Sequence, residues 1–346
     1  MEQVLLDKAR LAELIDFLVA RQKIFAPVAL GHGQFKFAEV SSLAEMTLDY
    51  LPTILPPKKF VLPPRETLLE YDISEGGQHM KPLVEVEDLT VFGVHSCDLV
   101  GLQCLSMVFA DHPRDYNHQF REKSLTLIGL ECLAPCDHHA HCAMLNSHLP
   151  QGGYDLFFTE LEESYFVDTY TSRGEGIVSD SKLFEPVDRA ALKRFDNVRR
   201  RKNDLFRRER QALHSRQIKH LFETGFEHAV WDEIGRKCLS CGNCTNVCPT
   251  CYCFDISDTP ELDLLHGRRV RSWDSCQHEG FALVAGAENF RKDRGDRLRH
   301  RFYRKFFYPL ERYKRMFCTG CGRCSRSCMA GIDLLETVAA LTERPG

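Results

Sequence analysis

Apolar residues near the start of the chain recur with the spacing of one helical face. Within residues 3–20 they fall at Leu5, Leu11, Leu14, Ile15 and Leu18. This period predicts a surface helix whose apolar side packs against a core. Residues 34–72 differ, because five prolines interrupt their short apolar runs. Proline at this density excludes a regular helix and predicts extended segments and turns.

Four apolar runs further along the chain predict buried strands. They cover residues 89–94, 124–130, 154–159 and 165–170. Between the first two runs, Asp98 is suited to cap a helix that extends as far as Phe109. Strands that alternate with helices indicate an α/β domain, which we expect to comprise residues 1–185.

A basic segment follows this domain. Residues 189–219 contain twelve lysines or arginines and only three acids, with apolar residues too loosely spaced for a clean amphipathic face. We therefore expect residues 186–225 to form an exposed, mostly helical connector. An arm that binds nucleic acid, as in a redox-sensing regulator, is the alternative interpretation. The net charge of -4 disfavours it, so no nucleic-acid partner is expected.

The C-terminal part, residues 226–346, is rich in cysteine, and residues 278–315 within it have a helical and basic pattern. The predicted fold class is thus α+β, an N-terminal α/β domain followed by a mostly α-helical domain. No apolar run reaches the roughly 18 residues that a membrane-spanning helix needs, so we expect no such helix. The N-terminus includes acids and no uninterrupted apolar stretch, so we expect no signal peptide and a cytoplasmic location.

Cysteine is the most informative residue type, because the chain has sixteen. A cytoplasmic protein keeps its thiols reduced, so clustered cysteines indicate metal sites rather than disulfides. Two runs share the spacing C-x2-C-x2-C-x3-C, which is typical of ferredoxins with two [4Fe–4S] clusters. The first run is Cys238, Cys241, Cys244 and Cys248, and the second is Cys318, Cys321, Cys324 and Cys328.

The same spacing predicts which thiolates share a cluster. Three cysteines on one tight loop reach three iron atoms, whereas the fourth leaves along a helix and reaches the other cluster. We therefore assign Cys238, Cys241, Cys244 and Cys328 to the first cluster, and Cys318, Cys321, Cys324 and Cys248 to the second. Structural zinc is the alternative, but zinc sites favour two pairs of ligands. The long spacer between the runs, which we expect to be helical, indicates that helices hold the clusters.

Other residues near the runs have two interpretations each. Cys251, Cys253 and Cys276 are expected to pack as small hydrophobic residues, or else to form a sulfur shell that tunes the cluster potential. The basic residues within 291–315 either offset the negative charge of the clusters or form a solvated helix face. Cys104 is expected in the core of the helix that follows Cys97.

A separate group of cysteines lies where two predicted strands end. Cys97 follows the first of these strands, and Cys132, Cys136 and Cys142 follow the second. Parallel strands deliver their carboxyl ends to one sheet edge, so these four residues are candidates for a third metal site. The site suits a third [4Fe–4S] cluster, or zinc with nearby histidines as additional ligands. Those histidines are His138, His139 and His141. An exposed loop with incidental thiols is the remaining alternative.

The sequence offers no nucleotide-binding motif. No G-x-G-x-x-G follows a predicted strand, and there is no P-loop. A chain that holds clusters without a hydride carrier or substrate site is expected to pass electrons between other subunits. A redox enzyme with its own active site at the N-terminal cysteines is the alternative function.

Several motifs, spread from end to end of the chain, resemble those of one family. They are Leu55–Leu69, Gly93–Leu99, Gly153–Thr159, Trp273–Cys276 and Ala285–Arg291, together with both cysteine runs. In this order they resemble the beta subunit of cytosolic sulfhydrogenases, which is similar to the corresponding iron–sulfur subunit of anaerobic sulfite reductases. The resemblance departs at residues 132–142, where the family tends to have Cys-Phe-Cys. This chain has His-Ala-His-Cys142 there, with an extra Cys136.

The resemblance implies a component of a cytoplasmic oxidoreductase complex. Such a component relays electrons between a flavin subunit that uses NAD(P)H and a catalytic subunit. The catalytic subunit is a nickel–iron hydrogenase or a sirohaem sulfite reductase.

Overall fold

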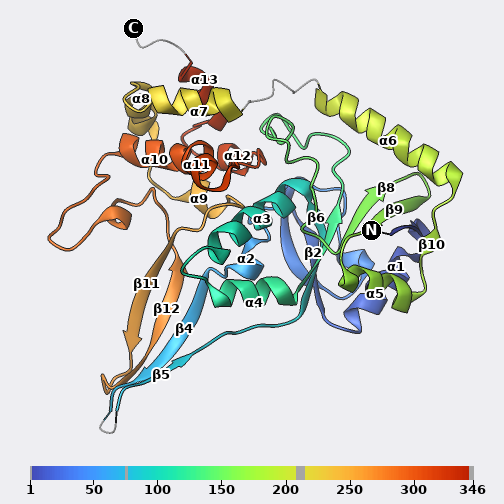
Figure 1. Cartoon of the computed structure of the whole chain (residues 1–346), viewed down its shortest axis with the longest axis horizontal. Coiled ribbons are helices and arrows are strands. Elements are labelled where there is room, and N and C mark those ends of the chain that lie inside the picture. The colour runs from blue at the N-terminus through green and yellow to red at the C-terminus, as the bar shows by residue number, and fades with distance from the viewer. Residues whose placement is uncertain (1, 75–76, 208–214, 343–346) are drawn as a thin grey trace.

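The computed structural model describes residues 2–74, 77–207 and 215–342, and a mixed eight-stranded sheet lies at the centre of its N-terminal part (Figure 1). From edge to edge the strands are β10 (Glu185–Pro186), β1 (Gln3–Asp7), β9 (Ser164–Thr169), β8 (Leu156–Glu160), β7 (Leu125–Leu130), β6 (Leu89–His95), β2 (Lys23–Gly31) and β3 (Gln34–Val40). The strands β2, β6, β7 and β8 are parallel, and the outer strands pair antiparallel with their neighbours. The carboxyl ends of β6 and β7 therefore lie at the same edge of the sheet.

Helices pack on both faces of this sheet. In chain order they are α1 (Leu11–Val19), α2 (Lys58–Val61), α3 (Ser96–Ala110), α4 (Tyr116–Ser124) and α5 (Ser172–Ser181). Phe92 and Phe158 belong to one core together with apolar side chains of α1. Their sequence neighbours Val91 and Phe157 belong to another core together with those of α3. Side chains alternate along a strand, so adjacent residues serve opposite faces of the sheet.

The four predicted strands of this region are confirmed as β6, β7, β8 and β9, and the predicted helix after the first of them is confirmed as α3. The helix predicted over residues 3–20 is wrong in its first part. Val4 and Leu6 are buried and their neighbours are not, because β1 pairs with β9 and β10. Asp98 was expected as an N-cap, but α3 begins after His95, which occupies that position.

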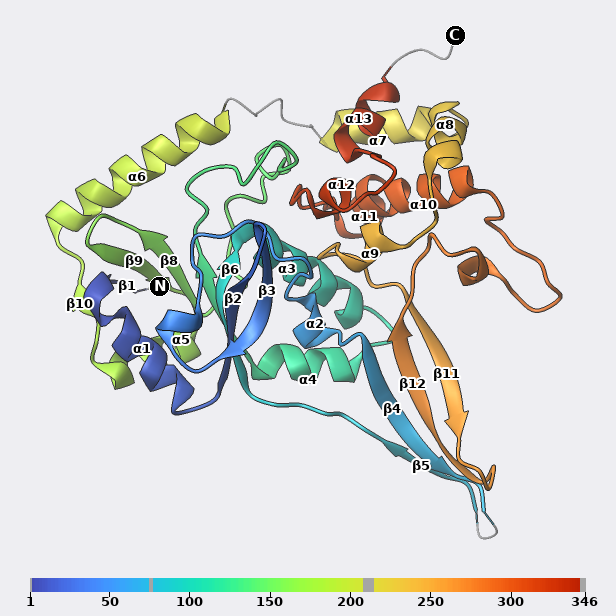
Figure 2. The ribbon, with the colours of Figure 1, turned by 180° about the vertical axis from the view of Figure 1, so that it is seen from behind.

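A second, four-stranded antiparallel sheet combines two strands from the N-terminal part of the chain with two from the C-terminal part. Its order is β11 (Phe254–Pro260), β12 (His266–Trp273), β4 (Arg65–Asp72) and β5 (His79–Pro82). It projects from the body of the molecule (Figure 2). Where β12 meets β4, the buried Arg271 donates from Nε to Oε1 of Glu66 at 2.8 Å.

The expectation of a wholly helical spacer between the cysteine runs is therefore wrong. β12 pairs with its hairpin neighbour β11 on one side and, on the other, with β4, which lies about two hundred residues earlier in the chain. The sheet is completed by that distant pairing with β4, and the local pattern of β11 and β12 did not indicate it.

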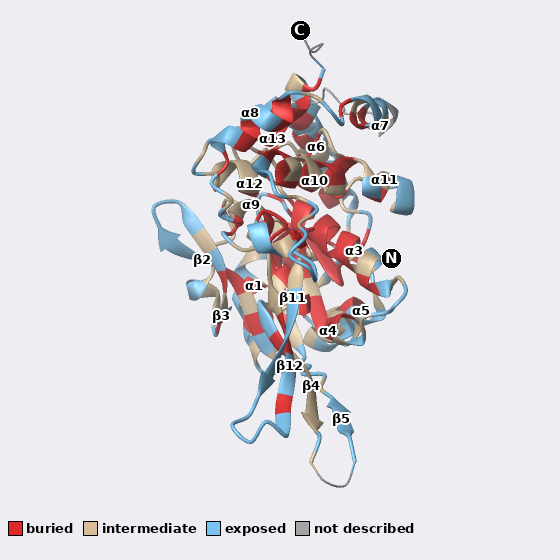
Figure 3. Cartoon of the chain, turned by 90° about the vertical axis from the view of Figure 1, so that its left-hand side faces the viewer, coloured by how far each residue is buried: buried red, intermediate tan, exposed pale blue. Residues whose placement is uncertain are grey.

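The rest of the C-terminal part is helical. Its helices are α7 (Ser215–Thr224), α8 (Val230–Lys237), α9 (Asn243–Asn246), α10 (Arg294–Phe306), α11 (Tyr308–Tyr313), α12 (Arg323–Arg326) and α13 (Leu334–Ala340). Phe222, Trp231, Phe302 and Phe306 form the centre of its core. Buried residues concentrate in α3 and α10, whereas the second sheet is mostly exposed (Figure 3).

The basic connector is helical but not fully exposed. It contains α6 (Arg189–Arg207) and α7, and residues 208–214 between them lie outside the described part of the chain. Lys202 and Phe206 of α6 are buried, and Lys202 Nζ lies 2.8 Å from Glu131 Oε1 at the end of β7. Within the described residues, no helix has the length and apolar character needed to cross a bilayer.

Candidate metal centres

The two cysteine runs fold in the same way. Each contains a glycine with positive φ, Gly242 at +76° and Gly322 at +73°, and a one-turn helix begins after it. A Cβ atom at Gly322 would lie 2.5 Å from the His139 carbonyl oxygen, so both the backbone angle and the close packing require glycine there. The fourth cysteine of each run follows its one-turn helix and is carried away from the other three.

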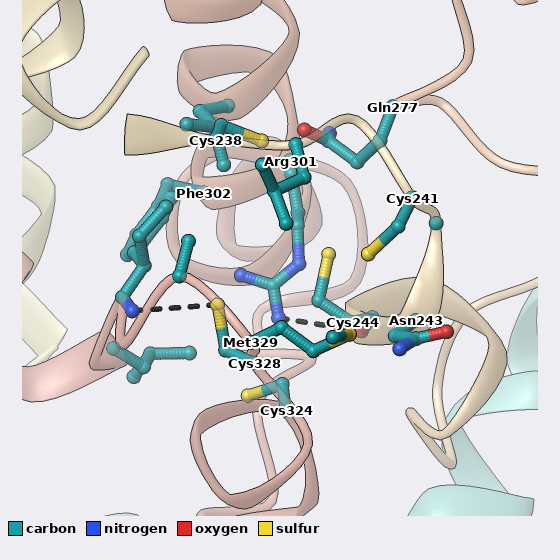
Figure 4. A pocket seen from close by; sticks show the side chains of 16 residues that line it. Cys238, Cys241, Asn243, Cys244, Gln277, Arg301, Phe302, Cys324, Cys328 and Met329 are labelled. Atoms are coloured by element: carbon teal, nitrogen blue, oxygen red, sulfur yellow. Dashed lines mark hydrogen bonds between the residues drawn. The ribbon is translucent and has the colours of Figure 1, made fainter. Parts of the chain in front are cut away.

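Cys238, Cys241, Cys244 and Cys328 line a first cavity. Figure 4 shows their sulfur atoms around a common space, into which the Arg301 side chain also projects. Backbone N–H groups donate to two of the thiols, from Ser240 to Cys238 and from Ile332 to Cys328, both at 3.3 Å. The last cysteine of the second run therefore lies beside the first three of the first run.

The second cavity has the complementary set. Cys248, Cys318, Cys321 and Cys324 line it, together with backbone of the second run and with Lys305. Cys324 and Arg301 line both cavities. The two cavities therefore share a wall, which is the arrangement that short-range electron transfer requires.

Two buried cations near these cavities identify the charge that the sites are built to hold. Arg301 and Lys305 are 4% and 3% exposed, and in the described residues neither has a carboxylate within 4 Å. Lys305 donates to Thr250 Oγ1 at 2.7 Å, and Arg301 donates to the Cys244 carbonyl at 3.4 Å. A buried cation without an anion is costly.

The donor set supplies that missing anion. Burial opposes the charge of Lys305, but the neighbouring Cys248 and Cys251 raise its pKa above the usual lysine value. A [4Fe–4S] cluster with four thiolates is anionic, so the chemistry of the site fits such clusters. Of the basic residues within 291–315, these two thus have the location needed to offset cluster charge.

The neighbouring cysteines form two pairs. Cys251 is buried beside Cys248, and the hydrogen bond with Cys248, together with burial, raises the pKa of its thiol. Cys276 is buried beside Cys253 in the same way. Cys251 thus packs beside Cys248, which lines the second cavity. Cys104 is fully buried in α3, as predicted.

The N-terminal cysteines also come together. Cys97 follows β6 and Cys132 follows β7, so the sheet delivers both to one edge. Cys97 and Cys142 are buried in contact with Cys321 of the second run, and Cys132 packs against them. Cys136 lies beside Cys132, and a hydrogen bond between them, together with burial, raises the pKa of Cys132.

His95 joins this group, although its sequence pattern did not single it out. Its ring nitrogen and the thiols of Cys132 and Cys136 lie within 4.8 Å of one another. Burial lowers the pKa of His95 to about 3, so the imidazole is neutral. Its position two residues before Cys97, at the end of a strand, was the available signal. In the described residues, no such group includes the three histidines considered from the sequence, His138, His139 and His141.

Asp98 connects this region to the second run. It is fully buried and accepts from Arg323 Nη2 at 2.7 Å. Arg323 lies between Cys321 and Cys324 in the chain and also donates to the Thr53 carbonyl. The ion pair therefore fixes the second run against the N-terminal end of α3.

Comparison with known proteins gives an independent view of this site. Residues 237–332 match the model of a 4Fe-4S dicluster domain. The sulfhydrogenase 2 subunit beta of Pyrococcus furiosus is 32% identical over 347 residues, which cover 99% of each chain. No solved structure matches the chain.

The cavities and the matching domain define an iron–sulfur protein that carries [4Fe–4S] clusters and acts in electron transfer. The end-to-end similarity goes further: the chain belongs to the family of sulfhydrogenase beta subunits. The resemblance recognised in its motifs is thereby confirmed.

Proposed function

We propose that the chain relays electrons through two [4Fe–4S] clusters, each of which takes its fourth ligand from the other cysteine run. Cys238, Cys241, Cys244 and Cys328 hold the first cluster, and Cys318, Cys321, Cys324 and Cys248 hold the second. One observation carries this proposal: the last cysteine of each run lines the cavity of the other run, and the two cavities share a wall. Each cluster, when bound, takes up and releases one electron at a time.

The chain's own residues set the conditions for this relay. Arg301 and Lys305 offset the negative charge of the clusters from buried positions. Backbone N–H groups such as that of Ile332 donate to ligand sulfurs and favour the thiolate form. Apolar side chains such as Leu298 and Phe302 form much of the wall of the first cavity and limit the contact of a cluster there with water.

The first cavity is the proposed contact point for a redox partner. Cys241 is exposed, and Leu239 and Met329 beside it are 58% and 80% exposed. Exposed apolar side chains at the mouth of a redox site are typical of an interface with another protein.

The relative's name, subunit beta of a sulfhydrogenase, supports a place in a hetero-oligomer. We propose that one partner is a flavin subunit that oxidises NAD(P)H and that the other is a catalytic subunit of the hydrogenase type. A sulfite reductase in the catalytic position is the alternative. We place this complex in the cytoplasm, where the many free thiols stay reduced.

The test uses the full chain, purified without oxygen, alone and with candidate partner subunits. Alone, it is expected to hold at least about eight irons and as many sulfides, and to show reduced-cluster signals in electron paramagnetic resonance. It is also expected to bind no FAD and to leave NAD(P)H unoxidised until a flavin subunit is added. NAD(P)H oxidation by the isolated chain would contradict the relay.

A further inference from the structure

The four N-terminal cysteines converge on one place although they come from separate segments. Cys97 lies in the first turn of α3, Cys132 lies just after β7, and Cys136 and Cys142 lie in the loop that follows. Cys97 and Cys142 are 6% and 8% exposed. We name Cys97, Cys132, Cys136 and Cys142 the N-terminal cysteine group.

The loop that carries this group is docked on the second cysteine run. The His141 N–H donates to the Gly320 carbonyl at 2.6 Å, and Ser147 Oγ donates to the Thr319 carbonyl. A Cβ atom at Gly320 would lie 2.4 Å from the His141 carbonyl carbon. Cys321, which lines the second cavity, belongs to the same buried cluster as Cys97 and Cys142. The cysteine group and the second cavity are thus direct neighbours.

Two polar groups beside the cysteines lack the partner that burial demands. His95 Nδ1 and Ser96 Oγ have no hydrogen-bond partner in the described structure, and the two residues are 5% and 1% exposed. Buried polar groups in folded proteins are nearly always hydrogen-bonded. Both residues immediately precede Cys97, so a bound group with sulfur acceptors would satisfy them.

The chemistry of the donors selects between a single ion and a cluster. One ion fits His95, Cys132 and Cys136, whose ligand atoms lie within 4.8 Å of one another. That choice leaves Cys97 and Cys142 unused, although both are buried against the second run. Four thiolates around a larger group use the whole set, and four thiolates are the usual ligands of a [4Fe–4S] cluster.

We propose that the N-terminal cysteine group binds a third [4Fe–4S] cluster, which extends the relay from the second cluster into the N-terminal sheet. This inference rests on the proposed relay. In the step concerned, the reduced second cluster passes one electron to the oxidised third cluster, and no bond or proton changes. A pocket of about 760 Å³, lined by Cys132, Cys136 and His95, opens beside the group and gives the relay a second outlet.

The test counts iron, acid-labile sulfide and zinc in the full chain, purified without oxygen. About twelve irons and no zinc are expected. Cys97→Ser and Cys142→Ser should each lower the count to about eight, because each removes one ligand of the third cluster. Cys104→Ser is the matched control, since Cys104 is buried in the same helix as Cys97 but lies outside the group. It should retain about twelve irons.

His95→Gln separates the cluster from the single ion. The third cluster does not use His95 as a ligand, so this variant should also keep about twelve irons. About eight irons with one zinc, lost in His95→Gln but kept in Cys142→Ser, would overturn the proposal in favour of an ion. About eight irons without zinc would exclude any third site. Fewer than eight would refute the two-cluster relay itself, so the two failures are distinguishable.

Discussion

The two cavities of the C-terminal part have the same cysteine spacing but different surroundings. The first opens to solvent at Cys241, between the exposed side chains of Leu239 and Met329. The second is covered by the loop before Ser147 and by α3, where a Cβ atom at Gly101 would lie 2.6 Å from Pro249. Spacing thus sets how many thiols surround a cavity, whereas tertiary packing decides whether that cavity faces a partner or the interior.

The largest expected effect comes from removing the fourth cysteine ligand of either cluster. Cys328→Ala should remove the exposed first cluster, and Cys248→Ala should remove the covered second one, with a loss of about four irons in each case. The measurement is the rate at which a water-soluble chelator removes the irons that remain. Slower iron loss from Cys328→Ala than from Cys248→Ala supports the assignment of each fourth cysteine to the cluster of the other run. The reverse order would contradict that assignment.

A smaller effect is expected from the cation that only the second cavity uses. Lys305→Met removes a buried positive charge, so reduction of the second cluster becomes less favourable. Its potential should fall by on the order of 100 mV, and that of the first cluster should change less. Redox titration followed by electron paramagnetic resonance measures both potentials.

Lys314→Met is the control for that substitution, because Lys314 is exposed and lines neither cavity. Equal shifts of both clusters in Lys305→Met, or a comparable shift in Lys314→Met, would show that the cation does not distinguish the cavities.

The smallest effect is expected at the mouth of the first cavity. Met329→Gln and Leu239→Gln should slow electron exchange with the partner protein by about five- to tenfold, since they weaken an apolar contact. Iron content and potentials should stay unchanged. Leu262→Gln replaces a fully exposed apolar side chain between β11 and β12, away from the cavity mouth, and should have no effect. Stopped-flow reduction through the partner provides the rates, and unchanged rates in all three variants would remove this mouth as the contact point.

Much of this organisation could be predicted from sequence, because it depends on local geometry. The four apolar runs of the N-terminal part became strands, and the glycine-containing cysteine runs folded into matching one-turn helices. Grouping of the cysteines around two cavities follows from the same short spacings. Their ligation of clusters stays a prediction.

What escaped prediction depends on contacts between distant residues. The basic pattern within 291–315 did not distinguish Arg301 and Lys305, which line the cavities, from the other basic residues of the segment. Asp98 had the position of a helix cap, but its partner Arg323 lies in the second cysteine run. His95 gave no signal by itself, and only the convergence of two strand ends brought it beside Cys132.

The pairing of β4 with β12 has a consequence for how this protein can be divided. In the sequence, the cluster-binding part resembles an independent domain. Its β11–β12 hairpin, however, pairs with β4, which begins at Arg65. Separating the N-terminal part from the C-terminal part would leave one edge of β4 unpaired, and an unpaired strand edge promotes aggregation. It would also deprive Glu66 of Arg271, one of its buried partners. Transfer of the cluster-binding part to another protein should therefore succeed only when the β11–β12 hairpin and strands β4 and β5 are transferred with it.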